Sequence, residues 1–466
     1  MHFKKNFFFF VLFFSISIFA QKDFTLKQVI LEAPSLSPTK LNQLQWIPDT
    51  QEFSYVEESE NGIELVAEQI ETGNKKILTT LDELNSSLSF ALLDSVINYP
   101  RFTWYSSTEI WFWQQNKLIL FNIYNNKLIV LNEVDQDGTN YDFIIPDKIA
   151  YTIDNNLFIA DNSNQIKVTN DDNPAIVNGK SVHRVEFGIT KGTFWSPNSN
   201  YLAFYSKDET MVTDYPIVDV TQKPAALVNN KYPMAGMKSH HVNVGVYNLT
   251  TGATTWLNTG EPKDQYLPGV TWSPNERFIF INVLNRDQNH LKVSKYDVKT
   301  GELVKVMFEE TNEKYVEPDH GPIFFEDEPD MFLWQSRNEG WKQLYLYDAS
   351  GTRILKLTKG EWEITDFDGF DNSGTNVYFT STQESPLERH YYRLSLDSYK
   401  TTKITNEPGT HKVLKNPNGK YFLDTYSSTS VPNRVDLLNK DGELIRTVYE
   451  ASNPLEGYNI GTTEIV

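Results

Sequence analysis

Side chains that could hydrolyse a peptide bond are present in this sequence, but not in the patterns that hydrolases use. A serine nucleophile of the α/β-hydrolase type lies in a Gly-x-Ser-x-Gly turn between a strand and a helix, and this motif is absent from the 466 residues. The nearest stretches, residues 179–183 and 372–374, lack the pair of glycines. We therefore expect no catalytic residue in the chain itself.

Metal and cofactor sites find no support either. The sequence has no cysteine, which excludes thiolate nucleophiles, zinc–cysteine sites, iron–sulfur clusters and disulfides. His240 and His241 are adjacent, but neighbours in a strand point to opposite faces, so they make a poor chelate. No Gly-rich phosphate loop or His-Glu-x-x-His pair occurs. We expect neither a metal nor a cofactor.

Acidic residues dominate the charge. The chain has 61 Asp and Glu against 42 Lys and Arg, a net charge of −19. Such an excess repels nucleic acid and anionic membranes and attracts cationic ligands, such as the free amino end of a peptide. Adjacent carboxylates such as Glu309 and Glu310 leave open a glycosidase with paired acids. Among so many acids, however, such pairs arise by chance.

The first twenty residues have the pattern of a secretory signal peptide. Lys4 and Lys5 precede an apolar run over residues 7–20, and Ala20 offers a small residue for cleavage. The run is short for a helix that crosses a bilayer, which needs about 20 residues. We expect residues 1–20 to be removed and the protein to be exported to the periplasm, cell envelope or exterior of a bacterium. Export without cysteine suits that route better than a eukaryotic one.

The remaining sequence predicts an all-β chain. One stretch, residues 24–32, has helical periodicity, within a lead-in that we place at residues 21–43. From Leu44 onward, short runs rich in Tyr, Phe, Val, Ile and Thr alternate with turn signals. No further amphipathic helix of a dozen residues separates these strands, which argues against a parallel α/β sheet.

A repeated turn phrase indicates the architecture. An aromatic strand end followed by a Pro turn and then by Asn, Asp or Gly occurs at residues 45–49, 194–198 and 271–275, and a related form at 415–419. Such recurrence predicts a β-propeller of four-stranded blades over residues 44–455. Six to eight blades fit this length, and we favour eight. A pair of β-sandwiches is the alternative. The long interval between Asp208 and His241 predicts an insertion.

Several stretches resemble the bacterial dipeptidyl peptidase IV family of prolyl peptidases. Residues 182–219 begin VHRVEFGITKGTFWSPN, residues 232–252 read YPMAGMKSHHVNVGVYNLTTG, and residues 313–367 contain EKYVEPDHGPIFF and LTKGEWEITDF. In that family an eight-bladed propeller caps an α/β-hydrolase domain that carries the Ser-Asp-His triad. By resemblance, Glu186 is the carboxylate that binds the free amino terminus of the substrate. Arg184 either pairs with Glu186 and supports it or is an ordinary surface charge. Many relatives have two glutamates here, whereas this sequence has Val185 beside Glu186.

The resemblance implies the substrate-gating propeller part of a secreted serine exopeptidase that releases dipeptides after Pro or Ala. Residues 456–466 are then a linker toward a hydrolase domain, which residues 1–466 do not include. The chain alone is expected to be inactive. Its expected partners are peptide amino termini, that hydrolase domain and a second copy in a homodimer. The alternative is a stand-alone periplasmic propeller that binds peptides or a protein without catalysis.

Overall fold

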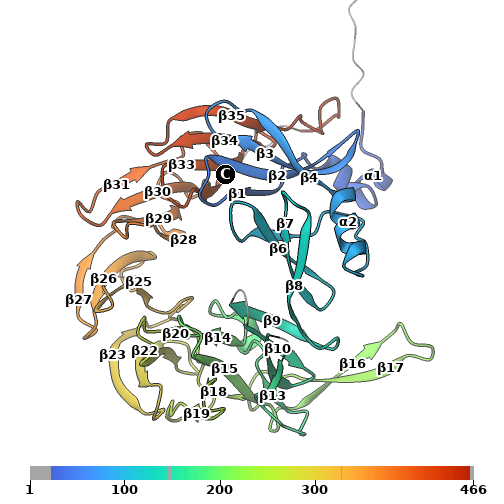
Figure 1. Cartoon of the computed structure of the whole chain (residues 1–466). Helices are drawn as coiled ribbons and strands as arrows, with labels where there is room; N and C mark the ends of the chain where they lie inside the picture. Colours follow the sequence, from blue (N-terminus) through green and yellow to red (C-terminus); the bar gives the residue numbers. More distant parts are fainter. Residues whose placement is uncertain (1–21, 145–147, 163, 327, 462–466) are drawn as a thin grey trace, which may run out of the picture.

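The protein is an eight-bladed β-propeller, as the repeated turn phrase predicts (Figure 1). The computed structural model describes residues 22–144, 148–162, 164–326 and 328–461. The expected signal peptide (1–20) and the last residues of the expected linker (462–466) lie outside these described residues. Blade 1 lies beside blade 8, so the blue and red ends of the chain meet and the ring closes (Figure 1).

In the first three blades, consecutive strands pair in antiparallel fashion, and in blade 4 the order is β13-β15-β18-β19. Blade 4 differs in that β13 and β14 share one position at the edge of its sheet. The strands of these blades are β1 (Asn42–Trp46), β2 (Glu52–Ser59), β3 (Gly62–Gln69), β4 (Lys75–Thr80); β5 (Phe102–Trp104), β6 (Glu109–Gln114), β7 (Lys117–Asn122), β8 (Lys127–Glu133); β9 (Thr139–Ile144), β10 (Lys148–Ile153), β11 (Asn156–Asp161), β12 (Asn164–Lys167); β13 (Ile176–Asn178), β14 (Thr193–Trp195), β15 (Tyr201–Asp208), β18 (His241–Asn248) and β19 (Thr254–Trp256).

The other four blades are regular four-stranded antiparallel sheets. Their strands are β20 (Thr271–Trp272), β21 (Phe278–Leu284), β22 (His290–Asp297), β23 (Leu303–Thr311); β24 (Ile323–Phe324), β25 (Met331–Ser336), β26 (Gln343–Asp348), β27 (Arg353–Lys356); β28 (Ile364–Phe370), β29 (Asn376–Ser381), β30 (His390–Ser395), β31 (Thr401–Lys403); β32 (Thr410–Lys415), β33 (Tyr421–Ser427), β34 (Arg434–Asn439) and β35 (Leu444–Glu450).

The core is divided among the junctions between blades. Each of the eight apolar clusters joins side chains from two neighbouring blades, and one of them joins blade 8 to blade 1. A blade is a small sheet with two apolar faces, so only its neighbours can bury it. The aromatic residues supply this burial: Trp334, Tyr205 and Phe204 are among the largest fully buried side chains.

The repeated turn phrase also ties the blades together through hydrogen bonds. The tryptophan in each phrase donates its indole N–H to a backbone carbonyl on the first strand of the preceding blade, and a lysine does the same where the phrase has no tryptophan. These bonds are Trp46 to Leu414 (2.8 Å), Trp195 to Asp142 (3.2 Å), Trp272 to Phe194 (3.0 Å) and Lys415 to Phe370 (2.6 Å).

The helices differ from the prediction. The N-terminal helix is present as α1 (Leu26–Ile30), followed by the 3₁₀ turn η1 (Ala33–Leu36). The expectation of a single helix is wrong, because α2 (Leu81–Phe90) follows β4 and places Leu84 and Leu88 in the cluster between blades 1 and 2. None of the helices in the described ranges is long and apolar enough to cross a membrane.

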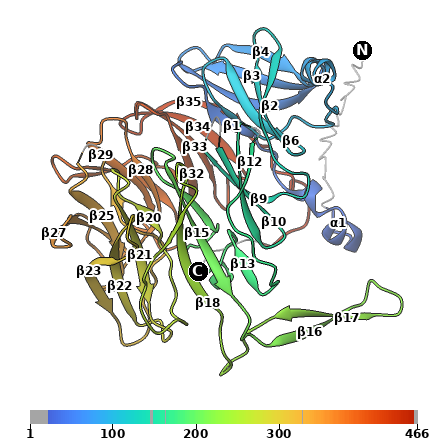
Figure 2. The same cartoon turned by 60° about the horizontal axis from the view of Figure 1, so that its bottom comes forward.

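The insertion predicted between Asp208 and His241 forms a two-stranded arm. It contains β16 (Asp214–Asp219) and β17 (Ala226–Lys231), which pair with each other and with no other strand among the described residues. The arm projects away from the ring (Figure 2). At its base it approaches the excursion that carries Glu186.

Candidate amine-binding site

Glu186 lies on an excursion that interrupts one edge strand of blade 4. β13 and β14 both pair with β15, the former at residues 206–208 and the latter at residues 202–204. Between them, residues 179–192 leave the sheet, and Glu186 stands near the middle of this segment, which we call the Glu186 loop. The β14 part of this edge faces the centre of the ring (Figure 1).

The backbone of the Glu186 loop has an unusual conformation. The φ angles of His183, Arg184, Val185 and Phe187 are 51°, 57°, 59° and 56°. For residues with a side chain, each such left-handed conformation costs about 1–2 kcal/mol. A run of them persists only where the surrounding structure fixes it, and such strain clusters at functional sites.

His183 anchors the Glu186 loop to the neighbouring segments. Its side chain is buried, its Nε2 accepts a hydrogen bond from the backbone N–H of Leu267 (3.3 Å), and its Nδ1 lies 3.1 Å from Nε2 of His240. Because Nε2 is an acceptor, Nδ1 of His183 carries the proton and donates a hydrogen bond to Nε2 of His240. Burial, reinforced by nearby positive charges, lowers the pKa of His183 well below its usual value and that of His240 to about 4. Both rings are therefore neutral at neutral pH, and the anchor does not titrate there.

Tyr266, from the segment before blade 5, fixes the other end of the loop. Its ring packs edge-on against Phe187 (5.0 Å between centroids) and against His183 (4.9 Å). Gly188 follows with φ of +72°, and a Cβ at this position would lie only 1.9 Å from the carbonyl oxygen of Asp319. Glycine is therefore required here by both conformation and space.

These contacts present Glu186 at a cavity of about 410 Å³ between blades 4 and 5. The Glu186 side chain is exposed and has no hydrogen bond or ion pair within the described part of the chain. The cavity is also lined by Arg184, Lys207, Glu209 and Arg286, among others. An unpaired carboxylate on a rigid loop at a cavity wall can bind an ammonium group.

Arg184 does not contact Glu186 through an ion pair among the described residues. Instead, its guanidinium lies 4.0 Å from the centroid of the Tyr232 ring, at the base of the arm. The two predicted site residues thus come from one loop and line the same cavity, but the Arg184 guanidinium packs on Tyr232, whereas the Glu186 carboxylate has no ion pair among the described residues.

Three residues of this cavity were not identified from sequence: His183, Tyr266 and Arg286. They come from different segments and lie close together only in the folded ring, so no local sequence motif predicts them. His240 was considered only beside His241 as a metal pair, whereas its ring contacts His183. The described residues contain no group of three or more His, Asp or Glu that could hold a metal ion.

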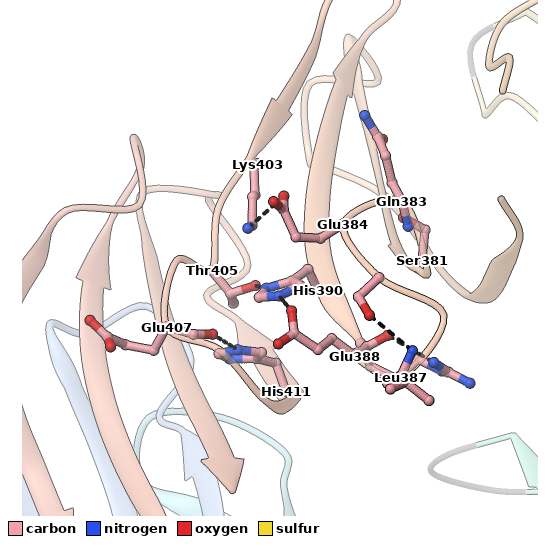
Figure 3. Close-up of polar contacts among 12 residues, drawn as sticks. Ser381, Gln383, Glu384, Leu387, Glu388, His390, Lys403, Thr405, Glu407 and His411 are labelled. Carbon is pink, nitrogen blue, oxygen red and sulfur yellow. Dashed lines mark hydrogen bonds and ion pairs between the residues drawn. The ribbon is translucent and has the colours of Figure 1, made fainter. Parts of the chain in front are cut away.

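A second polar cluster lies between blades 7 and 8 (Figure 3). Nε2 and Nδ1 of His390 contact Glu388 (2.9 Å) and Thr405 (3.1 Å). His411 contacts Asp424 through Nδ1 (2.8 Å) and the backbone carbonyl of Glu407 through Nε2 (2.7 Å). Each ring is buried and uses both nitrogens. The two rings also pack against each other, with 4.8 Å between their centroids, so the cluster connects blades 7 and 8 and leaves no imidazole nitrogen for acid–base chemistry.

The propeller fold agrees with the comparison with known families. The model of the family described as "Dipeptidyl peptidase IV (DPP IV) N-terminal region" matches residues 144–433. The chain belongs to this family.

Individual relatives support the same assignment. A protein of Aspergillus fumigatus named "Probable dipeptidyl peptidase 4" is 24% identical over 440 residues, which cover 88% of this chain and 56% of the relative. A "Probable dipeptidyl-aminopeptidase B" of Emericella nidulans is 27% identical over 335 residues, covering 65% of this chain and 37% of the relative. The chain thus spans about half the length, or less, of these curated relatives.

Two solved structures have a similar fold. The structure titled "a putative dipeptidyl aminopeptidase IV" from Bacteroides ovatus has a TM-score of 0.84 and 32% identity, covering 94% of this chain and 64% of that one. Dipeptidyl peptidase 4 of Porphyromonas gingivalis has a TM-score of 0.74 and 23% identity, covering 92% and 62% respectively. The latter likeness concerns the fold alone.

Proposed function

We propose that this chain is the propeller part of a serine exopeptidase of the dipeptidyl peptidase IV type, and that Glu186 binds the free amino terminus of the substrate. The observation that carries the proposal is the unpaired, exposed carboxylate of Glu186 on a strained loop at the wall of a cavity. Membership of the family supports the same role. We further propose that the protein acts after export, in the bacterial periplasm, the cell envelope or outside the cell.

In this proposal Glu186 sets the length of the released product. A carboxylate fixed to the propeller pairs with the ammonium of the peptide and thereby holds the chain end at one distance from the bond to be cut. The ring excludes folded proteins from the cavity by size. Cleavage after a second-position Pro or Ala then requires a serine nucleophile in a hydrolase domain, because residues 1–466 contain no Gly-x-Ser-x-Gly motif.

The test is to measure binding to the purified chain by calorimetry with two ligands, Ala-Pro amide and N-acetyl-Ala-Pro amide. They differ only in the ammonium group, and we expect the free amine to bind at least about tenfold more tightly, as a charge-assisted hydrogen bond would provide. Glu186→Gln should abolish this preference. Glu361→Gln, which removes an exposed carboxylate elsewhere, serves as the matched control. Equal binding of the two ligands to the unmodified chain would contradict the proposal.

Hydrolysis provides a separate check. The purified chain should not cleave a Gly-Pro chromogenic amide. Turnover that a serine-directed inhibitor blocks would show that the nucleophile lies within these residues after all.

A further inference from the structure

Arg286 gives the cavity an unpaired positive charge, opposite in sign to that of Glu186. Two of the four cations that line the cavity are already paired, Lys207 with Glu209 (2.9 Å) and Lys231 with Asp214 (3.0 Å). Arg286 is exposed and has no carboxylate partner among the described residues, in a chain whose net charge is −19. Its guanidinium is thus available to an anionic ligand.

Tyr266 holds Arg286 in a fixed relation to the Glu186 loop. Nη1 of Arg286 donates a hydrogen bond to the Tyr266 hydroxyl, Nε2 of Gln288 donates to the same oxygen (3.3 Å), and the guanidinium lies 5.2 Å from the centroid of the ring. The same ring packs against Phe187, the residue next to Glu186. One buried side chain therefore positions both the carboxylate loop and the guanidinium.

We propose that this cavity binds a free, zwitterionic dipeptide, with Glu186 on its ammonium group and Arg286 on its terminal carboxylate. The inference rests on the proposed amine-binding role of Glu186 and adds the second charge. A planar guanidinium matches a carboxylate through two parallel hydrogen bonds. The two charges of an extended dipeptide are separated by about 6–7 Å, and a cavity of about 410 Å³ is within the range of small-ligand sites.

The consequence concerns the products of the proposed reaction. An exopeptidase that releases dipeptides generates this zwitterion at every turnover, whereas a longer substrate has its carboxylate beyond the reach of Arg286. The cavity would then bind the released dipeptide more tightly than the corresponding part of a substrate. Dipeptides should therefore act as competitive inhibitors of a complete enzyme.

Arg184 is the other unpaired guanidinium of the cavity, but its placement favours Arg286 for this role. Arg184 lies on Tyr232, which directly follows the arm, and no hydrogen bond or cation–π contact joins it to Tyr266 among the described residues. The position of the Arg184 guanidinium therefore depends on the arm. The Arg286 guanidinium instead lies over the buried Tyr266 ring, which also packs against Phe187 beside Glu186.

The experiment compares three ligands by calorimetry on the full chain: Ala-Pro, Ala-Pro amide and N-acetyl-Ala-Pro. We expect Ala-Pro to bind about tenfold more tightly than its amide, because only Ala-Pro carries the carboxylate. Arg286→Gln should remove this difference. Tyr266→Phe, which keeps the ring and loses the hydroxyl, should reduce the difference in the same way. Arg353→Gln on β27 removes an equal charge at the outer strand of blade 6 and should have no effect.

The ligands separate this inference from the proposed function. If N-acetylation weakens binding but the amide binds as tightly as the free acid, the role of Glu186 stands and that of Arg286 is overturned. If the preference for the free acid persists in Arg286→Gln and is lost in Arg184→Gln, Arg184 binds the carboxylate of the dipeptide. The role proposed for Arg286 is then overturned. If N-acetylation has no effect, both are overturned.

Discussion

Gly188 is the residue on which the geometry of the Glu186 loop most directly depends. Its φ of +72° is accessible to glycine at little cost, and its missing side chain allows the carbonyl of Asp319 to approach. The neighbouring left-handed residues have side chains and tolerate the same conformation only because His183 and Phe187 are anchored on Leu267, His240 and Tyr266. Gly188 thus permits the close packing of the loop, and this packing holds the other left-handed residues in their conformation.

We predict that Gly188→Ala destabilises the protein and removes amine recognition. The added Cβ would meet backbone atoms of Asp319, so the loop must move, and we expect a loss of roughly 2–4 kcal/mol in the free energy of unfolding. Gly374→Ala is the matched control, since Gly374 has φ of +68° but no atom within 4 Å of the added Cβ. It should cost only about 1 kcal/mol. Urea unfolding and binding of Ala-Pro amide measure both effects; equal losses in the two variants would show that the contact with Asp319 is unimportant.

At the scale of elements, the turns between strands do more than reverse the chain. Glu276, in the turn between β20 and β21, is buried and accepts hydrogen bonds from the backbone N–H of Asn198 (2.6 Å) and the amide of Asn200 (2.7 Å) in the corresponding turn of blade 4. Together with the bond from Trp272 to Phe194, this contact fixes blade 5 against blade 4. The cavity lies at the same junction, so its shape depends on these turns.

Glu276→Gln should destabilise the protein in a pH-dependent manner. Burial raises the pKa of Glu276, but hydrogen bonds from Ser196, Asn200 and Asn198 outweigh this effect and lower it overall from 4.5. A carboxylate with a lowered pKa in the folded state stabilises the protein above its unfolded pKa, and this contribution is lost as the pH falls through the folded value. We expect a loss of about 1.5–3 kcal/mol at pH 7.

The difference in unfolding free energy between the two proteins should shrink as the pH falls below 4.5, the ordinary pKa of the side chain. Urea titrations from pH 7 to pH 3.5, with Glu361→Gln as the control for an exposed carboxylate, measure it. A difference that stays constant over this range would mean that the charge of Glu276 does not contribute.

The elements also show what the sequence could and could not predict. The blades were predictable because the turn phrase recurs and does the same at four junctions, where its Trp, or Lys415 in its place, donates a hydrogen bond to the preceding blade. The helix α2 was missed although Thr80 and Glu83 form a capping box, a local signal that precedes it. The left-handed loop at Glu186 could not be derived from local sequence, because its conformation is imposed by Tyr266 and His240 from other segments.

In the molecule as a whole, the ring is closed, and every junction between blades is formed by an apolar cluster of side chains from two neighbouring blades. Blade 8 meets blade 1 through a cluster that includes Trp46, Phe53 and Leu423, and Lys22 pairs with Tyr458 where the two ends of the described chain meet. The junction between blades 4 and 5, which forms the cavity, is built in the same way. Since each blade is buried only by its neighbours, opening any junction exposes two apolar faces and destabilises the adjacent blades.

We therefore predict that Trp46→Phe and Trp272→Phe destabilise the whole chain by similar amounts, although one junction closes the ring and the other lies within it. Each variant leaves a backbone carbonyl, that of Leu414 or Phe194, without its indole donor, which costs about 1–3 kcal/mol. Far-ultraviolet circular dichroism and tryptophan fluorescence during urea unfolding should give coincident single transitions in both cases. Separate transitions in Trp46→Phe alone would show that blades 1 and 8 unfold independently, in which case the ring is not one cooperative unit.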